Sequence, residues 1–329
     1  MAEGDAPKKP KRETIDVEIE GRTLTLSNQS KVLYPEAGFT KGQVVDYYRR
    51  IAPVLLPHLR DRPLTLKRYP NGVGAMYFFE KNATKSRPEW VRTVPIWGHG
   101  RGADLHYLLC DDTATLVFAA NLAALELHPS LSCARSLETP TMVVFDLDPG
   151  PPADLVTCCK AALVFRALFE TMGLQSVAKT SGNKGMQLYV PLNTPTTYDD
   201  TKGFARAIAE DFSEKHPDLF VSEMKKSVRD GKIFVDWSQN DFNKTTIGVY
   251  SLRARERPTV STPISWAEIE RAAESGDARA LVFEPDQVLA RVEAHGDLFA
   301  PAVELQQVLP DSPRATTKKR APRARKPKE

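Results

Sequence analysis

The stretch "MVVFDLDPG", residues 142–150, decides the fold because it joins an apolar run to two aspartates two positions apart. Its residues alternate as in a β-strand, so one face is apolar and the other carries Asp146 and Asp148. The apolar face consists of Val143, Phe145 and Leu147. Given the rise per residue of a strand, the two aspartate Cα atoms would lie roughly 6.5–7 Å apart. Their charges would repel unless a cation lay between them, although the motif alone also fits a strand end that caps a turn.

The segments around this strand indicate an α/β (α+β) fold. Apolar residues recur at helical spacing over 153–173, where Gly173 ends the helix. Three further strands are expected at 174–180, 185–192 and 231–238. This pattern predicts an α/β sandwich whose largely antiparallel sheet is covered by helices on one face.

The N-terminal part of the chain mixes short strands with a helix over 40–59, for which Thr40 is the expected N-cap. The strands of this lobe are expected at 23–27, 63–69 and 75–81. We therefore expect one folded body of two lobes over 14–300. A disordered basic leader, 1–13, would precede it, and a disordered basic, Pro-rich tail, 301–329, would follow it.

Positive charge is concentrated at the end of the chain. Residues 312–329 hold eight Lys or Arg and one acidic residue, a local charge of +7, whereas the whole chain carries +3. The remainder therefore carries −4. Such a tail adds salt-sensitive, sequence-independent attraction to phosphate backbones, or it simply keeps the chain in solution.

The composition does not suggest a membrane or secreted protein. No window approaches the roughly 18 consecutive apolar residues of a membrane span, and the N-terminus lacks the apolar core of a secretory signal. We therefore predict a cytoplasmic protein. The four cysteines form no CxxC pair and are expected to be reduced thiols of the core: Cys110, Cys133, Cys158 and Cys159.

A third aspartate strengthens the case for a cation. Asp236 lies on the polar face of the strand expected at 231–238, from which it could join Asp146 and Asp148. Oxygen donors without a nearby His or Cys set suit Mg²⁺ or Mn²⁺ better than zinc. An EF-hand is not indicated, because Pro and Gly follow the aspartates where further ligands would be needed.

Two later segments add groups that suit a triphosphate. The turn "KTSGNKG", residues 179–185, offers the hydroxyl of Ser181, the charge of Lys184 and two glycines that allow a close backbone approach, although it also fits an ordinary hairpin. Further polar and basic side chains follow Asp236: Gln239, Lys244, Arg253 and Arg255. Together with the aspartates, these residues indicate metal-assisted phosphoryl transfer.

At this point the sequence resembles the polymerase domain of bacterial ligase D, a branch of the archaeo-eukaryotic primase superfamily, and within it the stand-alone mycobacterial Prim-PolC type. The resemblance implies a primase-polymerase core with an antiparallel sheet like that of an RNA-recognition motif, plus an N-terminal lobe. No KxDG-type ligase motif occurs in the chain. The matching blocks run in the family's order: "SNQSKVLYPEAGFTKGQVVDYY", "LKRYPNGVGAMYFFEKNA", "ATLVFAANLAALELHP", "FDLDPG", "KTSGNKGMQLYVPL" and "GKIFVDWSQNDFNKTTIGVYSLRAR".

The resemblance implies a role for each matching residue. Asp146, Asp148 and Asp236 match the catalytic, metal-binding carboxylates. The residues that match the nucleotide site are Lys67, His128, Ser181, Lys184, Gln187, Gln239 and Arg253. Without the resemblance, His128 would be interpreted as an ordinary surface or core histidine.

Two further pairs match contacts with DNA. Phe78 or Phe79 matches an aromatic residue that stacks near the templating base, and the other phenylalanine of the pair would belong to the core. Lys31 and Lys41 match two lysines that bind the 5′-phosphate on the downstream side of a gap. Taken alone, the two lysines would be ordinary surface residues.

The chain departs from the family pattern in two places. The second block of the family reads SG-x-KG-x-H, and Gln187 stands at the position of the histidine. Glutamine can donate a hydrogen bond to a phosphate or to the metal site, but it carries no charge. Residues 95–112 also form a shorter stretch than in ligase D, which argues against bridging of DNA ends.

These observations predict a DNA-dependent nucleotidyltransferase that fills short gaps in 5′-phosphorylated DNA with ribonucleotides or deoxyribonucleotides, preferring ribonucleotides, and uses Mn²⁺ or Mg²⁺. It would act as a monomer near the bacterial nucleoid, in repair with a separate ATP-dependent DNA ligase. One alternative is a weakly catalytic scaffold that binds DNA ends and recruits a ligase. Another, a DxD sugar-nucleotide transferase, leaves the lysine pair and the aromatic block unexplained.

Overall fold

The computed structural model describes residues 13–98 and 100–310. The stretch with the two aspartates forms β12 (Met142–Pro149), at the centre of a six-stranded sheet with the order β15-β16-β12-β14-β13-β17. All neighbouring strands are antiparallel except β15 and β16. The other strands of this sheet are β13 (Val177–Thr180), β14 (Met186–Pro191), β15 (Phe220–Val221), β16 (Ile233–Asp236) and β17 (Pro263–Ile264).

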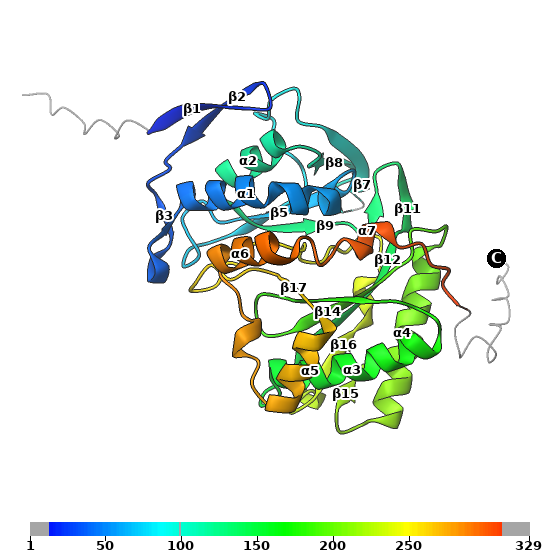
Figure 1. Ribbon diagram of the computed structural model, residues 1–329. Helices are drawn as coiled ribbons and strands as arrows, with labels where there is room; N and C mark the ends of the chain where they lie inside the picture. Colours follow the sequence, from blue (N-terminus) through cyan, green and yellow to red (C-terminus); the bar gives the residue numbers. More distant parts are fainter. Residues whose placement is uncertain (1–12, 99, 311–329) are drawn as a thin grey trace, which may run out of the picture.

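Helices cover one face of this sheet, as expected. Figure 1 shows α3 (Leu155–Thr171), α4 (Tyr198–Lys215) and α5 (Trp266–Ser275) in the lower half of the molecule around the strands. The ring of Phe145 packs on those of Phe165 and Phe169 of α3, with centroid distances of 5.0 and 5.4 Å. The apolar side of β12 is thereby fixed against the helices, so its polar side must face the other lobe.

Local sequence signals set the limits of the main helices. Asp154 caps α3 through a capping box with Thr157, and Gly173 follows the helix with φ of +70°. The long helix of the other lobe, α1 (Lys41–Leu59), begins after Thr40, whose side chain accepts a hydrogen bond from the amide of Gln43. The expected N-cap is therefore confirmed.

The N-terminal lobe is built on a second sheet. Strands β6 and β8 pair with one edge of β5, β9 pairs with the other edge, and β7 pairs with β8. The strands are β5 (Pro63–Arg68), β6 (Phe78–Glu80), β7 (Thr93–Gly98), β8 (Ala103–Leu109) and β9 (Ala124–Pro129). Helix α1 packs beside α2 (Thr113–Asn121), and both lie on this lobe (Figure 1).

Small elements complete the described chain. They are the strands β1 (Thr14–Ile19), β2 (Arg22–Ser27), β3 (Val32–Tyr34), β4 (Phe39–Thr40), β10 (Ser132–Cys133) and β11 (Ser136–Pro140), the helices α6 (Pro285–His295) and α7 (Pro301–Glu304), and the 3-10 turns Pro35–Ala37, Lys226–Val228, Trp237–Gln239 and Arg279–Leu281.

One irregular segment, residues 240–262, joins the two lobes; we call it the bridging segment. On the N-terminal side, the hydroxyl of Tyr47 donates to the carbonyl of Tyr250 at 2.8 Å, and the amide of Leu127 donates to Ser251 Oγ at 2.9 Å. On the other side, the amide of Val144 donates to Asn240 Oδ1 at 2.9 Å. The segment therefore binds both sheets.

The folded body extends beyond the expected limit at residue 300. Residues 301–304 form α7, and Gln307 donates to the carbonyls of Pro191 and Leu192 at 2.7 and 2.8 Å through its side chain and amide. The sequence between 301 and 310 looks too polar for a core, but its polar groups satisfy backbone carbonyls at the end of β14. The remainder of the tail and leader residues 1–12 lie outside the described residues.

Two other expectations can be compared with the described chain. All four cysteines lie within the described residues, where they are buried and free, as expected. Over residues 13–98 and 100–310, no helix combines the length and the apolar character that crossing a bilayer requires.

Candidate active site

A single row of polar side chains crosses four strands of the larger sheet. Asp146 on β12 lies directly opposite Asp236 on β16 and, on its other side, opposite Gln187 on β14. Gln187 in turn lies opposite Lys179 on β13. Directly opposed residues of antiparallel strands share a face, so the order across the sheet is acid, acid, amide, base. We call these four side chains the polar row.

Hydrogen bonds connect the basic half of the polar row to its centre. Lys179 is 1% exposed, and its ammonium donates to Gln187 Oε1 at 2.6 Å and to Ser261 Oγ at 2.7 Å. The amide of Gln187 hydrogen-bonds in turn to Asp146. Burial lowers the pKa of Lys179 to about 7, against the opposing charge of Asp146. Gln187 therefore lies inside the fold, between a buried base and a carboxylate.

The acidic half of the polar row gathers negative charge with little compensation. Burial, followed by the charges of Asp148 and Asp236, raises the pKa of Asp146. Burial and Asp236 raise the pKa of Asp148 as well. Carboxylate oxygens crowded in this way are the donors that Mg²⁺ and Mn²⁺ prefer, so the residues present fit such an ion.

The third carboxylate accepts hydrogen bonds from neighbouring groups of its own segment. Asp236 Oδ1 accepts hydrogen bonds from the amide and hydroxyl of Ser238 at 3.0 and 2.5 Å, and Oδ2 accepts one from Gln239 Nε2 at 2.6 Å. Within the described residues, no three His, Cys, Asp or Glu side chains form a ready-made metal cage. The donors are thus adjacent on two strands without converging on one point.

The "SGNKG" turn lies against the strand that carries the two aspartates. Ser181 Oγ accepts hydrogen bonds from the amides of Asn183 and Gly185, each at 3.2 Å, and so fixes the turn. A Cβ atom at Gly185 would lie 2.3 Å from the carbonyl oxygen of Leu147, so only glycine fits there. Lys184 is exposed, and its charge lowers the pKa of Asp148 against the larger effect of burial.

The N-terminal lobe and the bridging segment together place three basic side chains around one carboxylate. Glu126 on β9 is 2% exposed and lies opposite Lys67 on β5. Its Oε2 lies 3.0 Å from His128 Nε2 and 3.6 Å from Lys67 Nζ, and its Oε1 lies 3.7 Å from Arg253 Nε. Burial alone would raise the pKa of Glu126, but the hydrogen bond from His128 and the charge of Arg253 lower it to about 2. We call these four residues the cation cluster.

Exposed aromatic rings border the cation cluster. Lys67 Nζ lies 4.3 Å from the ring centroid of Tyr77 and 5.5 Å from that of Phe79. Phe78 and Phe79 are 44% and 54% exposed, so the expectation that one of them belongs to the core is wrong. Alternation along β6 points them to opposite sides, yet this short edge strand is open on both. Phe79 is on the side of His128, at a centroid distance of 5.8 Å.

The two lysines matched to a 5′-phosphate contact lie together. The amide of Lys41 donates to the carbonyl of Lys31 at 2.8 Å. Lys31 Nζ donates to the carbonyl of Pro70 at 2.6 Å and to Asn71 Oδ1 at 2.9 Å. Lys41 is only 5% exposed, and its Nζ donates to the carbonyl of Ser27 at 2.6 Å. The pair therefore differs from the solvated surface lysines that the sequence taken alone suggests.

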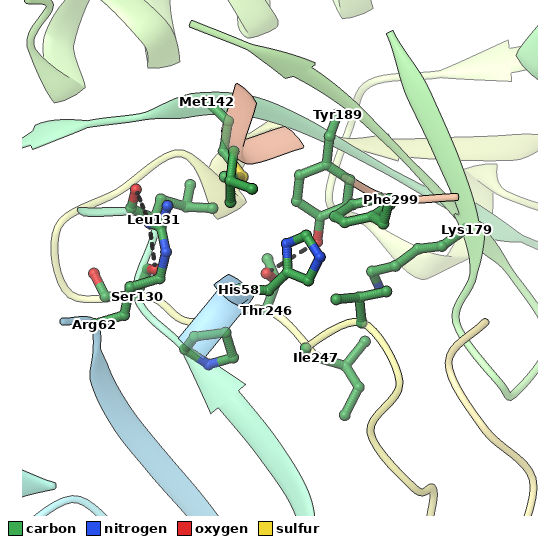
Figure 2. Close-up of a pocket in the computed structure, with 14 residues that line it drawn as sticks. His58, Arg62, Ser130, Leu131, Met142, Lys179, Tyr189, Thr246, Ile247 and Phe299 are labelled. Carbon is green, nitrogen blue, oxygen red and sulfur yellow. Dashed lines mark hydrogen bonds between the residues drawn. The ribbon is translucent and has the colours of Figure 1, made fainter. Parts of the chain in front are cut away.

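A small internal cavity lies behind the polar row. Figure 2 shows Lys179 and Tyr189 extending from the larger sheet toward the bridging segment, where the Tyr189 hydroxyl contacts Thr246 Oγ1 at 3.1 Å. His58 and Phe299 line the same cavity, whose volume is about 30 Å³. Lys179 therefore borders this cavity while its ammonium is satisfied by Gln187 and Ser261.

Two buried residues of the site are not among those that the sequence predicts. Lys179 lies within the "KTSGNKG" turn, and Glu126 stands two positions before His128 in "LELHP". Period-two alternation places Glu126 and His128 on the same face of a strand, which is the available signal. The pairing of Lys179 with Gln187 depends on the sheet register, which no short motif reveals.

Comparison with known proteins agrees with this geometry. Residues 40–299 match the family model of the LigD primase-polymerase domain. The fold and site thus define a primase-polymerase by class, and the chain belongs to the LigD primase-polymerase domain family.

Relatives and a solved structure give the extent of the match. The multifunctional non-homologous end joining protein LigD of Mycolicibacterium smegmatis is 42% identical over 280 residues, covering 84% of this chain and 36% of that protein. The Mycobacterium tuberculosis LigD is 40% identical over 286 residues, with the same coverage. The polymerase domain from M. tuberculosis ligase D in complex with DNA superposes with a TM-score of 0.79 at 37% identity, covering 85% of this chain and 98% of that one. The chain thus spans about a third of the length of these curated relatives.

Proposed function

We propose that this primase-polymerase is a DNA-dependent nucleotidyltransferase that fills short gaps in 5′-phosphorylated DNA and prefers ribonucleotides to deoxyribonucleotides. The observation that carries the proposal is the meeting of two opposite charge clusters between the lobes. Asp146, Asp148 and Asp236 belong to one sheet, whereas Lys67, His128 and Arg253 surround Glu126 on the other side. A metal–triphosphate complex is complementary to such a pair of clusters.

In this proposal the three aspartates hold one or two Mn²⁺ or Mg²⁺ ions. When bound, the metal supplies a positive charge that lowers the pKa of the primer 3′-hydroxyl and neutralises the leaving pyrophosphate. Asp236 would exchange its hydrogen bonds to Ser238 and Gln239 for contacts with the ion, which frees the Gln239 amide for the nucleotide. Gln187 holds Asp146 in orientation from within the fold.

The remaining residues of the nucleotide site act on the triphosphate. Lys67, His128 and Arg253 provide charge from the cation cluster, while Ser181 and Lys184 provide a hydroxyl and an ammonium from the turn beside Asp148. Arg253 Nε is buried and has no hydrogen-bond partner among the residues that the structure describes, so an incoming phosphate oxygen would satisfy it. Charge-assisted contacts of this kind hold the α-phosphate in line for attack.

Two surfaces would contact the DNA. The exposed rings of Phe78 and Phe79 suit stacking on a templating base. Lys31 and Lys41 would bind the 5′-phosphate of the downstream strand at the start of α1, where helix amides also favour an anion. The related ligase D polymerase domain was solved in complex with DNA, which supports this part of the proposal.

We further propose that the catalytic domain covers residues 14–310 and that it acts as a monomer in the bacterial cytoplasm, near the nucleoid. The curated relatives are end-joining proteins, so the context would be repair of DNA breaks, with an ATP-dependent DNA ligase acting in trans to seal the product. The basic residues of 312–329 would add salt-dependent affinity for DNA.

Primer extension tests the proposal. The substrate is a duplex with a gap of about one to three nucleotides, with or without a downstream 5′-phosphate, supplied with ribo- or deoxyribonucleotides in Mn²⁺ or Mg²⁺. We expect phosphate-stimulated incorporation that the Asp146→Ala/Asp148→Ala double variant loses. Tight DNA binding without incorporation under either metal would instead identify a DNA-end scaffold.

A further inference from the structure

The arrangement of the cation cluster fixes which ring nitrogen of His128 carries hydrogen. The carboxylate of Glu126 is ionised, since its pKa is held at about 2, so it can only accept hydrogen bonds. Its Oε2 lies 3.0 Å from His128 Nε2. Nε2 therefore donates, and the neutral ring leaves Nδ1 without a proton. Across the described residues, Nδ1 has no hydrogen-bond partner.

The other carboxylate oxygen of Glu126 also accepts a hydrogen bond. Glu126 Oε1 accepts a hydrogen bond from the backbone amide of Ala254 at 3.1 Å, which fixes the rotation of the carboxylate. The pairing of strands β5 and β9 also fixes the positions of these side chains, because Glu126 lies opposite Lys67 and His128 lies opposite Thr65. Glu126 is thus held on both sides and cannot turn away from His128.

The charged groups that face His128 come from three elements. Glu126 shares its strand, Lys67 lies on β5 and Arg253 lies on the bridging segment. The remaining neighbour from β6 is the uncharged ring of Phe79. Burial and the charges of Lys67 and Arg253 lower the pKa of His128 against the opposing effect of Glu126, so the ring of the free protein is neutral at mildly alkaline pH.

A triphosphate changes this balance because its oxygens accept hydrogen bonds and carry negative charge. A neutral ring with a bare Nδ1 repels such an acceptor, whereas an imidazolium donates to it through Nδ1 while it still donates to Glu126 through Nε2. The added proton comes from the solvent and binds the Nδ1 lone pair, with no bond broken in the nucleotide.

We infer that Glu126 is a positioning residue that holds His128 in the Nε2–H form, so that a nucleoside triphosphate binds together with one proton at Nδ1. This inference rests on the proposed function, since it concerns the same nucleotide site, and it adds a residue and a proton that the function itself does not require. Nucleotide binding is then coupled to pH, and affinity falls about tenfold per pH unit between the pKa of the free ring and the higher pKa of the ring in the complex.

The substitution Glu126→Gln separates this role from simple packing. The amide of Ala254 needs an acceptor, so the carbonyl oxygen of the substituted side chain takes the place of Oε1 and its NH₂ group points toward His128. His128 Nε2 must then accept, which moves the ring proton to Nδ1. The variant keeps the size of the side chain but presents a ready-made donor to the phosphate, so nucleotide binding no longer takes up a proton.

The test is calorimetric titration of GTP with Mg²⁺ into the full-length protein at about pH 8, in two buffers that differ in ionisation enthalpy. The γ-phosphate is already deprotonated there, so the nucleotide itself releases no proton. We expect uptake of about one proton per nucleotide by the wild type and close to none by Glu126→Gln. The variant His128→Gln, which cannot take up a proton, should also show close to none.

Each result has a distinct meaning. Wild-type binding without proton uptake would overturn the role of Glu126 while leaving the proposed function intact. Uptake that survives in His128→Gln would place the proton on a group other than His128 and overturn the inference as well. Absence of any GTP binding by the wild type would overturn the proposed function and this inference together. If Glu126→Gln fails to fold, the comparison of wild type with His128→Gln still decides whether the proton binds at His128, and absence of a difference between them overturns the inference.

Discussion

Lys179 and Asp146 are joined through the side chain of Gln187, which accepts a hydrogen bond from the ammonium at 2.6 Å and hydrogen-bonds to the carboxylate. Replacing Gln187 by leucine should remove both contacts and lower metal-dependent incorporation about 10- to 100-fold, since partners that orient a metal ligand commonly contribute that much. Gln187→His should stay within about tenfold of the wild type, because one ring nitrogen can accept from Lys179 and the other donate to Asp146. Steady-state primer extension measures both variants, and full activity of Gln187→Leu would contradict this role.

The crowded aspartates should limit stability while enabling catalysis. We expect Asp146→Asn to reduce primer extension by at least about 100- to 1,000-fold, through loss of a charged ligand. Without metal, the same change should raise the melting temperature by about 2 °C, since it removes repulsion with Asp148 and Asp236. Melting in EDTA and an extension assay give the two readouts. Asp218 is exposed, so Asp218→Asn serves as the control and should change neither primer extension nor the melting temperature. A lower melting temperature for Asp146→Asn would contradict the expected repulsion between Asp146 and the other two aspartates.

The lysine pair should separate into one purely functional and one partly structural residue. Lys41→Met leaves the Ser27 carbonyl without the buried ammonium, which should cost about 1–3 kcal/mol of the free energy of unfolding. Lys31→Met should cost little, since Lys31 is less enclosed. Both should reduce the stimulation of gap filling by a 5′-phosphate, and the same duplex with a 5′-hydroxyl is the internal control. Unchanged stimulation in both variants would remove the lysines from the phosphate site.

Two glycines allow a controlled test of how closely the turn beside Asp148 packs on β12. A Cβ at Gly185 would lie 2.3 Å from the Leu147 carbonyl oxygen, so Gly185→Ala should push the turn off β12, lower the free energy of unfolding by about 1–3 kcal/mol and weaken nucleotide binding. Gly203 lies within α4, where an added Cβ would meet no atom of another element within 4 Å, so Gly203→Ala should stabilise the protein by about 0.5–1 kcal/mol. Denaturant melts compare the two, and equal effects would contradict the role of close packing at Gly185.

Much of the fold around the site follows from local signals. Alternation in β12, the spacing and stop of α3, and the Thr40 cap of α1 are all predicted from short stretches, and the structure confirms them. The adjacency of Asp146 and Asp236 could be anticipated only as one arrangement among several, because strand order depends on contacts far apart in the chain.

The sequence is less informative where function depends on tertiary contacts. Phe78 and Phe79 look alike in a pattern of apolar residues, and only the position of β6 at a sheet edge leaves both exposed. Residues 301–310 look like part of the tail because their partners, Pro191 and Leu192, lie more than a hundred positions earlier. The roles assigned to the site residues stay predictions that the variants above test.

The bridging segment has a consequence for how the protein loses its structure. Leu252 and Val260 pack in the apolar core of the N-terminal lobe, while Ile264, just beyond the segment, packs in the core of the other. Unfolding of either core would remove packing contacts from the other core. We therefore expect heating to produce one calorimetric transition instead of two. The polar row and the cation cluster face each other where the two lobes meet. A form with one lobe unfolded would therefore lack half of the site, so loss of activity on heating should coincide with global unfolding.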